Sequence, residues 1–167
     1  IGYWGRRERQ DNGYREVESP DKKYMAYIRN SNIFVAPLNN MKAARQLTYD
    51  GNSKFAYSSK IQWSPDSKKL ASIKVEKVNI RQLTLIESSP KDQLQPKIQT
   101  RDYVKPGDAL SQKTPIVYNL ETNKLFVFDS SLIDNQFDIY PMSWRKDGRS
   151  ITFEYNKRGH QTYGVME

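Results

Sequence analysis

Apolar residues in this chain come in short runs separated by polar turns, which is the pattern of β strands. The clearest case is residues 151–155, where Ile151, Phe153 and Tyr155 alternate with polar neighbours. This alternation places one set of side chains on each face of a sheet. Further strands are predicted at 24–29, 32–38, 44–49, 60–63, 70–75, 82–87, 115–120, 125–129 and 161–166. Helical periodicity is absent over any useful length, so the predicted fold class is all-β.

A polar turn that leads directly into an apolar strand occurs three times along the chain. The turns read Ser-Pro-Asp-Lys-Lys, Trp-Ser-Pro-Asp-Ser-Lys-Lys and Trp-Arg-Lys-Asp-Gly-Arg, and their aspartates are Asp21, Asp66 and Asp147. Asp21 and Asp66 are 45 residues apart, close to the roughly 40–45 residues of a four-stranded propeller blade. Asp147 follows Asp66 by 81 residues, so the second unit contains a long insertion. Because one such unit cannot bury its apolar faces alone, the repeat predicts a partial β-propeller of about three four-stranded antiparallel blades.

This repeat predicts a division of the chain into four parts. These are a connector or edge segment at 1–13, a first blade at 14–57, a second blade at 58–137 and an incomplete third blade at 138–167. The second blade carries an extended polar insertion at 88–112, which contains three of the eight prolines. A fragment of a ring leaves its end blades uncovered, so self-association of the fragment is expected.

The charge of the chain does not predict a nucleic-acid partner. Lysine and arginine outnumber the acidic residues by 27 to 19, which gives a net charge of +8 at pH 7. These basic residues are mixed with acids, as at 6–9 and 74–77, and no cluster interleaves them with aromatic side chains. The chain has no cysteine, and no apolar run approaches the roughly 20 residues of a membrane-spanning helix. No targeting signal is visible, and since the chain does not begin with methionine, we interpret it as an excised or processed piece.

The residues that could carry chemistry have structural interpretations. His160 is the only histidine, and without a Gly-x-Ser-x-Gly motif we expect it to be a surface residue. Trp63 and Trp144 hold equivalent positions before their turns and are expected to pack between blades. Asp134 and Asp138 share a loop and have no evident partner. The Ser-Pro-Asp turns are expected to initiate strands. The sequence therefore predicts no catalytic, substrate-binding or metal-binding residue, and no cofactor.

The insertion and the last blade carry a family resemblance. Residues 87–97, followed by the Tyr-Val-Lys-Pro-Gly-Asp of 103–108, resemble the N-terminal propeller of dipeptidyl peptidase IV-type enzymes, which carry a Tyr-x-Lys-x-Gly element before an outer strand. Residues 153–161 are similar to the next blade of the bacterial members, particularly those of Bacteroidetes. The resemblance covers 2–167 and implies a parent serine peptidase of the prolyl oligopeptidase family. Such enzymes join an eight-bladed propeller to an α/β-hydrolase domain with a Ser-Asp-His triad, and they remove dipeptides from peptide N-termini.

The resemblance also implies partners and a location. The partners would be the remaining blades, the hydrolase domain and peptide substrates that the propeller gates and positions. The parent would be periplasmic, secreted or membrane-anchored. The alternative is a stand-alone propeller that binds a protein partner, as TolB-like propellers do. A Gly-x-Ser-x-Gly motif encoded downstream would favour the peptidase, and an early stop codon would favour the adaptor.

One departure from the family concerns substrate recognition. Dipeptidyl peptidase IV enzymes carry a Glu-Glu motif that anchors the substrate amine, just before the tryptophan of the second unit. The corresponding interval here, Gly51–Gln62, has no acidic residue, and its Lys54 and Lys60 would repel an amine. The sequence therefore predicts that another propeller segment supplies the acid, or that the parent accepts blocked N-termini.

Overall fold

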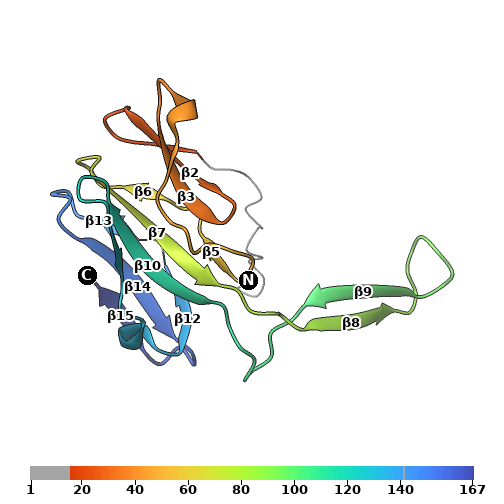
Figure 1. The fold of residues 1–167 in the computed structure, drawn as a ribbon. Coiled ribbons are helices and arrows are strands. Elements are labelled where there is room, and N and C mark those ends of the chain that lie inside the picture. Colours follow the sequence, from red (N-terminus) through yellow and green to blue (C-terminus); the bar gives the residue numbers. More distant parts are fainter. Residues whose placement is uncertain (1–15, 141) are drawn as a thin grey trace.

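Three antiparallel sheets stack face to face, and a two-stranded ribbon projects from the middle one (Figure 1). The computed structural model describes residues 16–140 and 142–167, so the predicted connector at 1–13 lies outside the described residues. The first sheet has the order β1-β2-β3-β4. Its strands are β1 (Val17–Glu18), β2 (Tyr24–Arg29), β3 (Asn32–Pro37) and β4 (Arg45–Gln46), with a short 3₁₀ helix, η1 (Met41–Ala43), before β4.

In the second and third sheets, one edge is formed by two short strands that both pair with the same neighbour. In the second sheet β5 (Phe55–Tyr57) and β6 (Gln62–Trp63) both pair with β7 (Lys69–Glu76), which is followed by β10 (Gln112–Asn119) and β11 (Lys124–Val127). In the third sheet β12 (Gln136–Ile139) and β13 (Ser143–Trp144) both pair with β14 (Ile151–Lys157), which also pairs with β15 (Tyr163–Met166). A second 3₁₀ helix, η2 (Ser130–Ile133), precedes β12. The all-β, partial-propeller fold expected from the repeat is confirmed.

Two of the expected blade boundaries differ from the strand pairing. Residues 55–57 pair with β7 and so belong to the second sheet, although they were expected to end the first blade. Residues 136–137 lie in β12 of the third sheet, although they were expected to end the second blade. The segments that lead from one sheet to the next are short, and their polarity does not show with which neighbouring strand the following residues will pair.

The three repeated turns have the same backbone conformation. Lys22, Ser67 and Gly148 occupy the same turn position, and all three have positive φ, at 55°, 59° and 67°. In each turn the aspartate just before this position accepts a hydrogen bond from the backbone N–H two residues after it, at 3.2, 3.1 and 3.1 Å. The left-handed conformation is strained for residues other than glycine, and these aspartate bonds help to hold it. The predicted equivalence of the three turns is therefore confirmed.

The two tryptophans before the turns join each sheet to the one before it. Trp63 in β6 donates its indole Nε1–H to the backbone oxygen of Val17 in β1, at 2.9 Å. Trp144 in β13 donates in the same way to Gln62 in β6, at 3.2 Å. Val17 and Gln62 hold equivalent positions, each two residues before the first residue of its turn. The predicted packing of both tryptophans between sheets is confirmed. In addition to its apolar contacts, each indole makes the same hydrogen bond to the preceding sheet.

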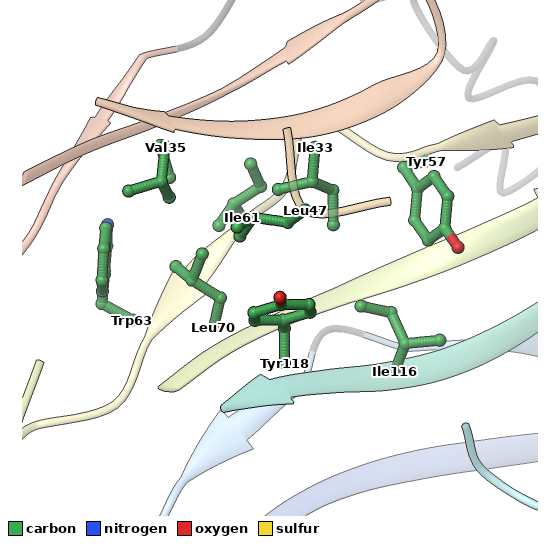
Figure 2. Close-up of a cluster of buried hydrophobic side chains, with 10 residues drawn as sticks. Ile33, Val35, Leu47, Tyr57, Ile61, Trp63, Leu70, Ile116 and Tyr118 are labelled. Carbon is green, nitrogen blue, oxygen red and sulfur yellow. The ribbon is translucent and has the colours of Figure 1, made fainter. Parts of the chain in front are cut away.

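Buried apolar side chains fill both spaces between the sheets. Figure 2 shows the first core, between the first and second sheets. Its members are Ala26, Ile33, Val35, Leu47, Tyr57, Ile61, Trp63, Leu70, Ile116 and Tyr118. The second core, between the second and third sheets, consists of Ala71, Ile73, Ile133, Ile139, Met142, Phe153 and Tyr155. Because neighbouring residues of β7 point to opposite faces, Leu70 lies in the first core and Ala71 in the second.

The insertion in the second sheet forms the projecting ribbon, which we call the arm (residues 82–102). β8 (Gln82–Glu87) pairs over its whole length with β9 (Lys97–Asp102), and β10 pairs directly with β7. The prediction that 82–87 is a strand of the second blade is therefore wrong, because this strand belongs to the arm. Its apolar pattern correctly indicates a strand but cannot indicate the pairing partner. Ile86 and Ile98 face each other across the arm and are 70% and 72% exposed.

Candidate functional site

A cluster of charged and aromatic side chains lies where the arm leaves the second sheet. The antiparallel register of β5 and β7 places Tyr57 opposite Lys74 and Phe55 opposite Glu76. Asp50, in the segment before β5, accepts hydrogen bonds from the Tyr57 hydroxyl, at 2.8 Å, and from the Lys74 ammonium. We call these five residues together with Lys54 the end cluster. They bring the first half of the Gly51–Gln62 interval against the end of β7.

Every carboxylate of the end cluster has a lysine partner. Asp50 pairs with Lys74, and the Glu76 carboxylate lies 2.9 Å from the Lys54 ammonium. The two ammonium groups also lie over the Phe55 ring, 5.1 and 5.2 Å from its centre. A lysine over an aromatic face is attracted by the negative charge of the ring face. The charges of the end cluster are therefore balanced within it, and neither carboxylate is without a cation.

The hydrogen bonds of the end cluster shift two pKa values. Burial raises the pKa of Asp50, but the hydrogen bonds from Lys74 and Tyr57 outweigh it and hold the pKa below its ordinary value. Burial, followed by the neighbouring Asp50 carboxylate, raises the pKa of Tyr57 well above its ordinary value. Tyr57 therefore stays a neutral donor and Asp50 stays a charged acceptor at physiological pH.

This arrangement should make the stability of the protein depend on acidic pH. Because the pKa of Asp50 lies below its ordinary value of 3.8 in the folded chain, its contribution is complete above that value and is lost as pH falls through the folded pKa. In Asp50→Asn this contribution is absent, so the free energy of unfolding should fall less between neutral and acidic pH than it does in the unmodified chain. We expect the difference to be less than about 1 kcal/mol, because the Asp50 side chain is 54% exposed and solvent screens its pair with Lys74. Urea denaturation at a series of pH values measures the effect, and equal pH slopes for the two proteins would contradict it.

A cavity of about 450 Å³ lies beside the second half of the interval. Its lining residues lie in or next to strands of all three sheets, and oppositely charged Glu16 and Lys60 are among them. The others are Val17, Ser59, Ile61, Gln62, Ile73 and Met142. Ile61, Ile73 and Met142 are buried, so the cavity has an apolar floor and a charged margin.

The residues singled out from the sequence do not form one site. His160 lies in the turn between β14 and β15, in a T-shaped contact with the Phe137 ring and with a ring nitrogen 3.0 Å from the Asn156 amide. The prediction that Asp134 and Asp138 have no partner is wrong. Asp134 lies 3.0 Å from the Lys157 ammonium, while Asp138 lies in β12 and accepts a hydrogen bond from Lys113 at 2.8 Å. The partners were not evident because they lie on other strands.

Residues 16–140 and 142–167 hold no group of three or more histidine, cysteine or acidic side chains placed to bind a metal ion. Over the same ranges, no helix has the length and apolar character needed to cross a membrane.

Sequence reasoning identified the interval but missed most of the end cluster. Asp50 immediately precedes the interval, and Glu76 lies in β7, far from it in sequence. The absence of an acid between residues 51 and 62 gave no indication that acids from either side approach it. Strand register supplies this information, and an Asp-Gly pair before a short apolar strand was the only local signal.

Comparisons with known proteins give a consistent result. The family described as "Dipeptidyl peptidase IV (DPP IV) N-terminal region" matches residues 14–166. The chain is similar to the crystal structure of Porphyromonas gingivalis dipeptidyl peptidase 4, with a TM-score of 0.65 and 18% identity over 90% of this chain. It is also similar to a Bacteroides ovatus protein described as a dipeptidyl aminopeptidase IV, with a TM-score of 0.65 and 15% identity over 93% of this chain.

The chain spans 23% and 22% of the lengths of these two proteins. None of the curated proteins compared with the chain matches it. At these identities the two structures support the fold, and the family assignment depends on the match over nearly all of the chain. This chain belongs to the dipeptidyl peptidase IV N-terminal region family.

Proposed function

We propose that this chain is the non-catalytic propeller portion of a serine exopeptidase of the dipeptidyl peptidase IV type. Its role is to gate peptide substrates and to position them for a separate α/β-hydrolase domain. The observation that carries this proposal is the family match over residues 14–166. The similarity of the fold to two proteins described as dipeptidyl peptidases supports it.

Within this function, the end cluster supports a relaxed requirement for a free substrate amine. A buried cationic amine needs a carboxylate to offset the hydration that it loses. Asp50 and Glu76 are the acids of the end cluster, and each is already neutralised by a lysine. An incoming amine would have to displace Lys74 or Lys54, so this segment favours substrates whose N-terminus is blocked, unless another segment supplies an acid.

The test compares two substrates of the complete protein that carries this chain. One is a chromogenic dipeptidyl-proline substrate with a free amine, and the other is its N-acetylated counterpart. We expect kcat/KM values within about tenfold of each other, because no salt bridge to the amine is lost. Loss of turnover on acetylation would contradict the relaxed requirement. Failure to cleave either substrate would contradict the peptidase function.

A charge-adding variant sharpens this experiment. Ser53 is exposed and lies in the turn before β5. Ser53→Glu adds a third carboxylate beside the two lysines that already pair with Asp50 and Glu76, so it should increase the preference for the free amine. Ser53→Gln is the matched control, because it adds the same length without charge and should leave the ratio of the two kcat/KM values unchanged. Equal ratios for both variants would show that this segment does not reach the substrate.

The edge of the third sheet is the surface at which we propose further assembly. The third sheet leaves Tyr163 and Val165 57% and 67% exposed. We propose that further blades and the hydrolase domain cover such surfaces, and that the isolated fragment self-associates through them. Periplasmic, secreted or membrane-anchored location is proposed on the family resemblance alone.

A further inference from the structure

The arm is joined to the second sheet by two connecting segments, which we call its legs. The first leg (77–81) follows β7, and the second leg (103–111) precedes β10. Six residue pairs, from Gln82 with Asp102 to Glu87 with Lys97, hold the arm together. An isolated two-stranded ribbon is only marginally stable in water and has no intrinsic direction relative to the body. The direction of this arm must therefore be set by contacts at its legs.

Asp108 is the residue at which contacts of the second leg converge. Its carboxylate accepts a hydrogen bond from the backbone N–H of Lys105, at 2.9 Å. The same carboxylate lies 3.3 Å from Nε of Arg81, so it joins the two legs. Its backbone oxygen accepts a hydrogen bond from the Arg158 guanidinium, at 2.5 Å. The Asp108 side chain is only 17% exposed, which strengthens these charge-assisted contacts.

Arg158 brings the third sheet into contact with the second leg. It lies in the turn between β14 and β15, and its own backbone N–H donates to the oxygen of Asn135 at 2.9 Å. The neighbouring Lys157 pairs with Asp134 at 3.0 Å, so the turn is itself fixed to the segment before β12. The guanidinium is therefore held by a well-anchored backbone and reaches the second leg from outside the arm.

The first leg begins at the end cluster. The backbone N–H of Lys77 donates to the oxygen of Lys54 at 2.8 Å, and Glu76 pairs with the Lys54 side chain. The two legs are thus fixed to different parts of the body. Lys54 holds the first leg near the Gly51–Gln62 interval, and Arg158 holds the second leg at the third sheet.

We infer that the contact between Arg158 and Asp108 is a clasp that fixes the direction of the arm relative to the third sheet. When the clasp is closed, both legs are held and the arm projects in one direction. When the clasp is open, Asp108 of the second leg still pairs with Arg81, but Arg81 belongs to the first leg and moves with the arm. Of these contacts, only those between the first leg and Lys54 then attach a leg to the body. The arm then swings about residues 77–81.

The inference is tested by measuring distances between two spin labels. The chain contains no cysteine, so labels are introduced at Leu94→Cys, at the fully exposed arm tip, and at Lys124→Cys, on the exposed edge strand β11. Double electron–electron resonance then gives the distribution of distances between the arm and the body. With the clasp intact we expect a single narrow distribution.

Substitutions at two neighbouring positions, Lys157 at the end of β14 and Arg158 in the turn after it, distinguish the clasp from general loosening. Arg158→Ala should broaden the distribution several-fold. Lys157→Ala removes the neighbouring ion pair with Asp134 and should leave the distribution narrow. A narrow distribution in Arg158→Ala, or equal broadening in both variants, overturns the inference. Should Arg158→Ala fail to fold, Arg158→Met keeps most of the apolar stem and removes the guanidinium donor to Asp108, and a narrow distribution in that variant also overturns the inference.

Discussion

Leu70→Ala is expected to lower the free energy of unfolding by about 2–5 kcal/mol. Leu70 lies in β7 and is fully buried, with 0% of its surface exposed. It is a member of the first core, where side chains of the first sheet pack on those of the second (Figure 2). The substitution removes apolar contacts and leaves a cavity between two sheets that cannot close freely, because the Trp63 indole is hydrogen-bonded across them. Urea denaturation followed by tryptophan fluorescence measures the change.

Leu94→Ala is the matched control. Leu94 lies at the tip of the arm and is 100% exposed. The same chemical change at this position should alter the free energy of unfolding by no more than about 0.5 kcal/mol. Similar effects of the two substitutions would show that the first and second sheets do not share the core described above.

Gln136→Ala should also cause a large loss of stability, for a different reason. Gln136 lies in β12 of the third sheet and is 3% exposed. Its amide oxygen accepts from the backbone N–H of Lys113 at 2.7 Å, and its amide nitrogen donates to the backbone oxygen of Lys113 at 3.0 Å. The Gln136 side chain thus makes, to the backbone of Lys113 in β10, the two hydrogen bonds that a neighbouring strand would otherwise make. We expect a loss of about 2–4 kcal/mol, because two partly buried hydrogen bonds are removed together.

The control for this substitution is Gln99→Ala. Gln99 lies on the exposed arm and donates a hydrogen bond to Glu87 at 2.9 Å. Because water can replace this bond, the free energy of unfolding should change by less than about 0.5 kcal/mol. An effect of Gln136→Ala no larger than that of Gln99→Ala would mean that the bond pair does not hold the second and third sheets together.

The features that recur in the chain were the ones that could be predicted. The turn aspartates and the two tryptophans each repeat, and repetition at blade spacing implies equivalent places in successive sheets. The structure adds that Trp63 and Trp144 make the same hydrogen bond. The alternation in 151–155 likewise predicted a strand with one buried face, and both Phe153 and Tyr155 lie in the second core.

Features that depend on a single distant partner could not be predicted. The strand at 82–87 has the same local character whether it pairs with a blade or with β9. Gln136 resembles any surface glutamine until its partner in β10 is known. The end cluster brings Asp50 and Glu76 to the same place through strand register, and register is a property of the paired chain. The sequence could show that Gly51–Gln62 lacks an acid, but not that lysines neutralise the acids beside it.

The tryptophan hydrogen bonds have a direction along the chain, and this bears on how the protein is made. In both cases the donor belongs to the later sheet, and the acceptor is a backbone oxygen of the earlier one. Because the ribosome extends the chain from its N-terminus, the backbone oxygen that accepts each of these bonds is synthesised before the tryptophan that donates it. Domains commonly fold in this order during synthesis, at about 5–20 residues per second. When the sheets fold in the order of their synthesis, each sheet is less exposed to pairing with the wrong neighbour, because the acceptor for its indole is already in place.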